Sequence, residues 1–225
     1  MDFSAFLPFD WSVFDWVNTT FTPGPGLHDG IDKFFSFITA LGDGGVFWIF
    51  LAVIFLLFKS TRKVGVVMAC ALLIDVVLVN GLLKNIFDRP RPFNLDWLIG
   101  NYQYPEVIER PDSPSFPSGH TAASLAGSLG MLFGTKWSPS KGFKVFASFM
   151  VALGCLVGFS RIYLEVHYAS DVLAGAVVGV LCAVLGFAVF KWGQPIYDKA
   201  NAKVVAATDK AVASLKRKKE DTQAV

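Results

Sequence analysis

Three short stretches of the chain contain the residue types that bind and transfer phosphate. They read KNIFDRPRP at 84–92, PSFPSGH at 114–120 and SRIYLEVHYASD at 160–171. Each stretch lies at the end of a long apolar run, where a membrane segment would meet water. Their basic side chains and histidines would therefore gather at one edge of a bilayer, which is the placement that a membrane-embedded phosphate site needs.

An anion site is predicted from the basic residues and from the start of one helix. The basic residues are Lys84, Arg91 and Arg161. An arginine offers a planar fork to phosphate oxygens and a lysine offers a point charge, so the three together would hold a phosphoryl group tightly. The hydroxyl of Ser118 and the backbone N–H of Gly119 would face the same anion. The helix that starts near His120 would add its positive end.

The two histidines of these stretches predict a covalent mechanism. His167 and Asp171 are four residues apart, so they share a helix face and the carboxylate can bond one ring nitrogen. The other ring nitrogen is then fixed as an unprotonated nucleophile. His120 lies on a different helix, and its imidazole titrates near neutral pH. It can therefore protonate the leaving oxygen and afterwards activate water.

Each of these signals alone has a simpler explanation. A single histidine at a helix end is usually an interfacial residue with satisfied hydrogen bonds, and an Arg-Pro-Arg-Pro run is usually a loop. All of these signals together in one chain indicate a phosphate site more strongly than any one of them alone. The third stretch, Ser-Arg-x5-His-x3-Asp, is specific by itself.

Together the stretches resemble the motifs of the type 2 phosphatidic acid phosphatase (PAP2) superfamily of membrane lipid phosphatases. The motifs match Lys84, Arg91 and Pro92; the PSGH at 117–120; and Ser160, Arg161, His167 and Asp171. The resemblance covers about residues 31–192. It implies a helical bundle and a metal-independent phosphohistidine mechanism without a cofactor. In it His167 is the nucleophile, His120 the acid, and the phosphate is bound by Lys84, Arg91, Ser118, Gly119 and Arg161.

The composition is that of an integral membrane domain. Of the 225 residues, 53% are hydrophobic and only 17% are charged, and the mean hydropathy is +0.50, far more apolar than a soluble domain requires. The formal charge of +2 is too small to indicate nucleic-acid binding. The three cysteines lie inside apolar runs without Cys-x-x-Cys spacing, so neither a disulfide nor a metal site is predicted.

Five apolar segments are expected to cross the membrane. They are residues 46–58, 64–83, 120–133, 143–159 and 172–192. The first is short for a hydrocarbon core about 30 Å thick, and small residues along the last suit close helix packing. Residues 1–30 are expected to form a leader with an amphipathic helix in the membrane interface. The prediction is therefore an all-α, polytopic membrane helical bundle, with the phosphatase domain at 31–195 and a basic tail at 196–225.

The distribution of basic residues predicts the orientation. Outside the three stretches they gather in three groups: Lys59, Arg62 and Lys63; Lys136, Lys141 and Lys144; and the lysines and arginines at 191–219. Five spans place all three groups on one side, which the positive-inside rule assigns to the cytoplasm. The C-terminus would then be cytoplasmic, and the phosphate site would face the periplasm or cell exterior.

Two further acidic residues lie in the second apolar segment and in the third stretch. Asp75 lies inside the second span, nine residues before Lys84, and we expect it to have a structural partner inside the bundle. Intramembrane carboxyls are expensive and often functional, so a catalytic role is the alternative. Glu165 would add negative charge beside the anion site and could affect the choice of substrate.

The leading functional prediction is an outward-facing lipid phosphatase or diphosphatase. The short chain without a hydrophobic first span looks like bacterial members that act on undecaprenyl pyrophosphate. Phosphatidylglycerophosphate and phosphatidate are the alternative substrates. A different class, a non-catalytic lipid-binding or transport protein of the same fold, would be expected to lose one or more of three residues that are present here, His120, His167 and Asp171. The sequence predicts no oligomeric state.

Overall fold

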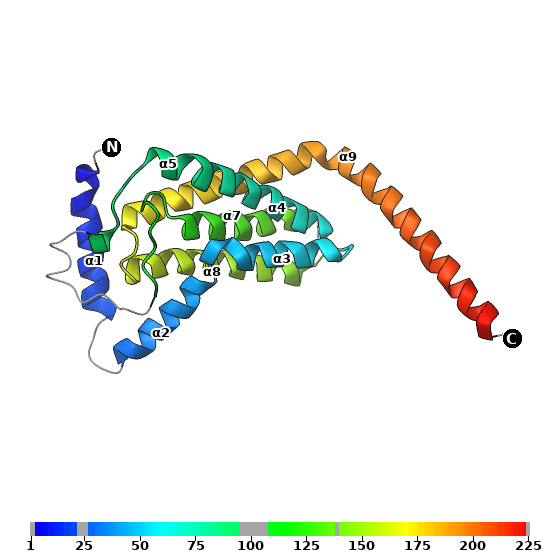
Figure 1. The fold of residues 1–225 in the computed structure, drawn as a ribbon, viewed down its shortest axis with the longest axis horizontal. Coiled ribbons are helices and arrows are strands. Elements are labelled where there is room, and N and C mark those ends of the chain that lie inside the picture. The colour runs from blue at the N-terminus through cyan, green and yellow to red at the C-terminus, as the bar shows by residue number, and fades with distance from the viewer. Residues whose placement is uncertain (1–2, 22–26, 95–107, 138–139, 224–225) are drawn as a thin grey trace. The chain divides into compact units, whose positions relative to one another are not determined.

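The five apolar segments all form helices in the computed structural model, which describes residues 3–21, 27–94, 108–137 and 140–223 (Figure 1). These helices are α3 (Val46–Leu57), α4 (Arg62–Asp75, continued by Val76–Leu83), α7 (Gly119–Gly134), α8 (Lys141–Tyr163) and α9 (Ala169–Gln223). They are joined by α1 (Leu7–Phe21), α2 (Leu27–Ala40), α5 (Lys84–Ile86) and short 3-10 turns at Ser4–Phe6, Asp43–Gly45, Pro92–Asn94 and Thr135–Trp137. The described residues contain no β-strand, as predicted for an all-α membrane bundle.

Fewer helices than expected are long enough to cross a membrane alone. Within the described ranges, Arg62–Ile86, Lys141–Tyr163 and Ala169–Leu215 have the required length and hydropathy. A fourth crossing results if the bent pair Asp29–Ala40 and Asp43–Leu57 forms one span. The difference from about five arises at α7, whose 16 residues are fewer than the roughly 20 that a hydrocarbon core needs.

Helix α7 is enclosed by its neighbours and carries the second predicted stretch at its start. It packs against both α4 and α8, and most of its residues are buried. Small residues allow α9 to approach it closely: a Cβ at Gly175 would lie 2.5 Å from the carbonyl oxygen of Ser118, and one at Gly179 would lie 2.6 Å from that of Ala122. The small residues predicted to favour packing in lipid thus seat the last helix against the site.

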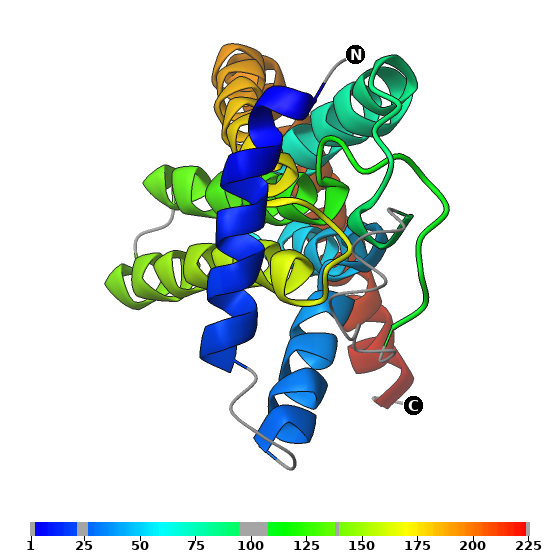
Figure 2. The same ribbon diagram turned by 90° about the vertical axis from the view of Figure 1, so that its left-hand side faces the viewer.

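Helix α1 lies across the end of the bundle at which the predicted site residues gather (Figure 2). Its buried face presents Phe14 and Val17 to a cluster that includes Tyr163 and Tyr168. Trp16, by contrast, is about half exposed. The N-terminal leader therefore contributes side chains to the core as well as an apolar surface.

The continuation of α4 is wound more widely than an α-helix. Residues Val76–Leu83 form a π-helix, a geometry that is rare and frequently found at functional sites. Nine residues correspond to about two and a half turns of an α-helix, which would place Asp75 and Lys84 on opposite faces. In the more widely wound π-helix, the nine residues from Asp75 to Lys84 make about two full turns. Both side chains can therefore face the same cavity.

Residues Ala188–Val225 form a second compact unit, separate from Met1–Phe187. This unit consists of the second part of α9, which continues as a helix to Gln223. The rings of Phe190 and Tyr197 contact each other at 5.5 Å between centroids. All the predicted site residues belong to the first unit.

Candidate active site

Backbone hydrogen bonds connect the three predicted stretches. The N–H of Ser115 donates to the carbonyl oxygen of Arg89 at 2.9 Å, which joins the first stretch to the second. The N–H of Ser118 donates to the carbonyl oxygen of Asp171 at 3.1 Å, which joins the second to the third. The prediction that the three stretches assemble from distant parts of the chain therefore holds in the structure.

His167 lies in the turn between α8 and α9 and is almost fully buried. The turn is made possible by Glu165, whose φ of 53° is in the left-handed region that non-glycine residues rarely adopt. The backbone N–H groups of Val166 and His167 both donate to the carbonyl oxygen of Arg161 at 3.2 Å. The histidine is thus attached to the same helix end as Arg161, one of the arginines predicted to bind phosphate.

The contacts of the His167 ring indicate which nitrogen is unprotonated. Nε2 lies 3.2 Å from Nη1 of Arg91, and a guanidinium can only donate. Nδ1 lies 3.5 Å from Oδ2 of Asp171 and 3.4 Å from Oγ of Ser115. These partners assign the proton to Nδ1 and the lone pair to Nε2. Burial and the positive charges of Arg91 and Arg161 lower the pKa of His167 well below its usual value, so the ring is neutral at pH 7.

The distance from His167 to Asp171 is longer than that of a good N–H···O bond, because the carboxylate is shared among other donors. Oδ2 accepts from the hydroxyl of Ser115 at 2.5 Å and from the backbone N–H of Tyr168 at 3.0 Å. Oδ1 accepts from Nη1 of Arg89 at 2.5 Å. His167 and Asp171 therefore lie side by side as predicted, but the 3.5 Å contact is too long for the predicted hydrogen bond. The Ser115 hydroxyl lies beside both residues.

Arg89 and Asp10 are members of this network that the sequence did not indicate. Nη2 of Arg89 donates to Oδ2 of Asp10 at 2.7 Å, and the guanidinium lies over the ring of Tyr168 at 3.9 Å. Asp10 also accepts from the N–H and the hydroxyl of Ser170, both at 2.8 Å. Asp10 comes from α1, so the N-terminal helix is bound to the start of α9 beside Asp171.

Two of the predicted phosphate-binding cations share a serine that was also missed. Arg91 donates to the carbonyl oxygen of Ser113 at 2.8 Å and to its hydroxyl at 3.1 Å, and Nζ of Lys84 donates to the same hydroxyl at 3.1 Å. Burial lowers the pKa of Arg91 to about 10, which leaves it charged at neutral pH. Ser113 therefore holds both cations close to His167.

The third cation, Arg161, is buried and only partly paired. Nη1 donates to the hydroxyl of Thr39 in α2 at 2.5 Å, whereas Nε has no hydrogen-bond partner. An unpartnered buried N–H is costly, and a phosphate oxygen would satisfy it. Among the described residues, no group of three or more His, Cys, Asp or Glu side chains could hold a metal ion.

The two remaining predicted phosphate-binding residues stand at the start of α7. Oγ of Ser118 is the N-cap oxygen and accepts from Thr121 Oγ1 at 2.9 Å, so its accepting capacity is used within the helix, while its own proton can still be donated to an anion. Gly119 faces Lys84: a Cβ here would lie 3.9 Å from Nζ.

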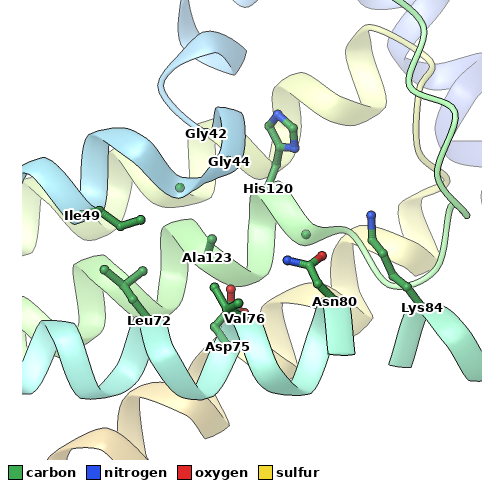
Figure 3. Close-up of a pocket in the computed structure, with 12 residues that line it drawn as sticks. Gly42, Gly44, Ile49, Leu72, Asp75, Val76, Asn80, Lys84, His120 and Ala123 are labelled. Atoms are coloured by element: carbon green, nitrogen blue, oxygen red, sulfur yellow. The ribbon is translucent and has the colours of Figure 1, made fainter. Parts of the chain in front are cut away.

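His120 stands between two cavities. One, of about 200 Å³, is lined by Lys84, Gly119, Asp75 and Asn80 as well as by His120 (Figure 3). The other, of about 390 Å³, is lined by Thr39, Asp43, Arg161 and residues 108–112 as well as by His120. Nε2 of His120 lies 2.7 Å from Oδ1 of Asp43. His167 lines neither cavity, and Arg91 covers its Nε2.

Asp75 and Glu165 are placed differently from expectation. Asp75 was expected to have a structural partner, but its buried Oδ1 has no hydrogen-bond partner, and the residue lines the cavity of Lys84 and His120. Glu165 lines neither cavity, and its Oε1 accepts from Nδ2 of Asn18 in α1 at 2.9 Å. Burial raises the pKa of Glu165 to about 7.

The chain is similar to several known phosphatases. The chain is 32% identical to an undecaprenyl-diphosphatase of Sulfolobus acidocaldarius over 59% of this chain and 58% of that one, and thus spans little more than half of that relative. It is 30% identical to a lipid A 4'-phosphatase of Porphyromonas gingivalis over 74% of this chain and 69% of that one. The crystal structure of a PAP2-type phosphatidylglycerolphosphate phosphatase from Bacillus subtilis superposes with a TM-score of 0.64, at 28% identity, and covers 84% of this chain and 87% of that one.

The family itself follows from a match that includes all three stretches. A sequence profile described as the PAP2 superfamily matches residues 63–195, more than half of the chain. The helical architecture agrees with that of the B. subtilis phosphatase, and the residues that the motifs predicted are gathered at one end of the bundle. The chain belongs to the PAP2 superfamily.

Proposed function

We propose that this protein is a membrane phosphatase that hydrolyses lipid phosphomonoesters or diphosphates through a phosphohistidine intermediate on His167. The observation that carries the proposal is the arrangement of the His167 ring. Its Nδ1 faces Asp171 and Ser115, and its Nε2 faces Arg91. A neutral imidazole with its lone pair directed at a phosphate-binding cation is a prepared nucleophile.

The reaction proceeds in two displacements at phosphorus. In the first, Nε2 of His167 bonds to phosphorus and the bond from phosphorus to the leaving oxygen breaks, while His120 gives that oxygen a proton. In the second, His120 takes a proton from water, the water oxygen bonds to phosphorus and the phosphorus–nitrogen bond breaks. The charge on the phosphoryl oxygens is stabilised in both steps by Lys84, Arg91 and Arg161.

Catalysis is proposed to be independent of metal ions. Lys84 and the two arginines supply positive charge where a catalytic metal would need carboxylate or imidazole ligands. The purified enzyme should therefore keep its activity in EDTA. Loss of activity in EDTA with recovery on addition of Mg²⁺ would contradict this part of the proposal.

Undecaprenyl pyrophosphate is the substrate that we propose first. The support is the similarity to a relative named undecaprenyl-diphosphatase. The second candidate is phosphatidylglycerophosphate, which the similarity to the B. subtilis structure favours, followed by phosphatidate. A non-catalytic lipid-binding protein is disfavoured because His120, His167 and Asp171 are all present.

The site is proposed to face the periplasm or cell exterior, with the C-terminus in the cytoplasm. The basic groups at 59–63, 136–144 and 191–219 support this orientation by the positive-inside rule. Substrate would then reach the site from the outer leaflet.

The experiment that tests the function is release of inorganic phosphate from a panel of lipids by the purified protein in detergent. The panel contains undecaprenyl pyrophosphate, phosphatidylglycerophosphate, phosphatidate and a lipid A phosphate. The highest kcat/KM is expected on undecaprenyl pyrophosphate, and a His167→Ala variant is the inactive control. Activity on none of the lipids would contradict the proposal. A higher kcat/KM on another lipid would contradict undecaprenyl pyrophosphate as the substrate.

A further inference from the structure

Asp43 makes the hydrogen bond that fixes the orientation of His120. Oδ1 of Asp43 lies 2.7 Å from Nε2 of His120, and the imidazole is about one fifth exposed. On its other side the ring lies against Gly42, because a Cβ added there would be 2.8 Å from Cδ2. One carboxylate and one glycine of the same turn thus hold the ring.

The backbone of this turn explains why Asp43 can reach the ring. Asp43 begins the 3-10 turn Asp43–Gly45 between α2 and α3. Gly44 and Gly45 have φ values of 56° and 68°, which are in the region that glycine adopts at no steric cost. The chain can therefore bend at this turn, by 41° between Asp29–Ala40 and Asp43–Leu57, with the Asp43 carboxylate within hydrogen-bonding distance of His120 at the start of α7.

We propose that Asp43 is a positioning residue for the general acid His120, so that the site contains two Asp–His pairs with complementary geometry. This inference rests on the proposed function and deepens it. In the first pair, Nδ1 of His167 faces Asp171, and Nε2, which faces Arg91, is the atom that attacks phosphorus. In the second, Nε2 of His120 is bound to Asp43, and Nδ1 is left for proton transfer.

The second pair assigns each proton of the cycle to an atom. Before the first displacement His120 is an imidazolium, with Nε2–H donated to Asp43 and Nδ1–H available to the leaving oxygen. Transfer of the Nδ1 proton leaves a neutral ring whose Nε2–H is still held by the carboxylate. Nδ1 then takes a proton from the attacking water, which restores the imidazolium. The carboxylate stabilises the acid form throughout and stays ionised itself.

Other charged groups also surround His120, and their effect must be separated from that of Asp43. Lys84 and Arg161 place positive charge near the ring. Further titratable groups line the two adjoining cavities: Asp75 on one side, and Glu109, Arg110 and Asp112 on the other. Asp112 is a suitable control because it is an exposed carboxylate in the same cavity as Asp43, but the hydrogen bond to His120 is made by Asp43.

The test compares Asp43→Asn, Asp43→Glu and Asp112→Asn with the wild type on two substrates. The first substrate is a lipid monophosphate, whose leaving alkoxide oxygen must be protonated. The second is p-nitrophenyl phosphate, whose leaving oxygen needs a proton much less. General acid catalysis contributes about 10²–10⁴ in rate, and we expect Asp43→Asn to lose about 10-fold to 10²-fold of kcat on the lipid monophosphate. The loss on the nitrophenyl ester should be about threefold or less. Asp112→Asn should change neither substrate by more than about twofold.

The pH profile provides the readout that a merely structural role would not change. The hydrogen bond to Asp43 favours the imidazolium form of His120, so losing it lowers the pH at which the ring gives up its proton. The alkaline limb of kcat for Asp43→Asn should therefore move to lower pH by about one unit, and Asp43→Glu should restore part of the shift. Equal losses with Asp43→Asn and Asp112→Asn would overturn the proposal. An unchanged limb together with equal losses on both substrates would also overturn it.

A measurement without substrate separates this proposal from the proposed function. The chain has only three histidines, so ¹⁵N-histidine labelling allows the His120 ring to be titrated by NMR in wild type and in Asp43→Asn. A titration midpoint that falls by about one unit in the variant supports the pair, even if the protein hydrolyses none of the lipids and the proposed function fails. An unchanged titration midpoint overturns the proposal that Asp43 stabilises the imidazolium of His120, even if the enzyme is active.

Discussion

Nη1 of Arg89 donates to Oδ1 of Asp171 at 2.5 Å, and both side chains are buried. The oxygen bound by Arg89 is the one that faces away from His167, since Oδ2 is the oxygen nearest Nδ1. Arg89 therefore balances the charge of Asp171 and fixes its direction at the same time. Its second nitrogen binds Asp10, which extends the network into α1.

Replacing Arg89 should destabilise the fold more than replacing an exposed basic residue. Arg89→Met leaves two buried carboxylates, Asp10 and Asp171, without their cation, and breaking a buried ion pair from one side costs about 3–5 kcal/mol. We expect a clear fall in the thermal unfolding temperature in detergent. Lys33→Met, at an exposed position of α2, is the control and should unfold within a degree or two of the wild type. Equal unfolding temperatures for the two variants would contradict a stabilising role for the ion pairs of Arg89 with Asp10 and Asp171.

Ser113 and Ser115 are two residues apart and should have different kinetic roles. Ser115 donates to Asp171, so Ser115→Ala should lower kcat about 10-fold and leave KM nearly unchanged, because the nucleophile is less well oriented. Ser113 holds Lys84 and Arg91, so Ser113→Ala should raise KM for a lipid phosphate or the Ki of inorganic phosphate. Steady-state kinetics on one substrate measure both variants. The assignment fails if the two serines change the same parameter.

The motifs predicted the centre of the site because each has an internal spacing that fixes its geometry. Lys84 and Arg91 come from one stretch, and His167 and Asp171 lie four residues apart where the turn leads into α9, so local structure is enough to bring each set together. Ser115 lies within the second predicted stretch, but its type alone did not indicate its bond to Asp171. A serine can satisfy its hydroxyl in many ways.

The missed residues are those whose partners are far away in sequence. Asp10 meets Arg89 across 79 positions, and Asp43 meets His120 across 77. These contacts depend on where α1 and the turn before α3 pack, which no local pattern determines. Asp75 was misjudged for a different reason: the expectation assumed an α-helical winding, and the π-helix at Val76–Leu83 turns it toward the cavity of Lys84.

Glu165 should make the stability depend on pH. Its pKa is 4.5 as a free side chain and about 7 in the folded protein, so the folded state binds its proton more tightly than the unfolded state does. Its contribution to stability is fully present below pH 4.5 and is lost as the pH rises to about 7, by an amount on the order of 1–3 kcal/mol.

The neutral variant Glu165→Gln removes this dependence. At pH 7.5 it should unfold at a higher temperature than the wild type, and the difference should shrink toward pH 4.5. Thermal unfolding of both proteins in matched buffers measures the effect. Asp15→Asn, at an exposed position of α1, is the control, and its difference from the wild type should stay constant. If the difference in unfolding temperature between Glu165→Gln and the wild type also stayed constant with pH, burial would not raise the pKa of Glu165 as proposed.

The proposed orientation predicts which exposed positions react from outside the cell. Single cysteines are introduced by Glu109→Cys and Ser140→Cys in a background in which Cys70, Cys155 and Cys182 are replaced. Both positions are exposed in the structure. In intact cells an impermeant thiol reagent should label only the variant at 109, because Ser140 lies beside the basic residues assigned to the cytoplasm. Labelling of only the variant at 140 would reverse the orientation.

The phosphoenzyme itself tests the central claim most directly. His120→Ala should slow the attack of water more than the formation of the intermediate when the leaving group is an activated aryl oxygen, so the covalent species should accumulate. The variant is mixed with a ³²P-labelled aryl phosphate, quenched in alkali, in which phosphohistidine is stable, and digested for mass spectrometry. We predict acid-labile phosphate on His167 and none when His167→Ala is added to the variant. Phosphate retained by that double variant, or found on another residue, would contradict His167 as the nucleophile.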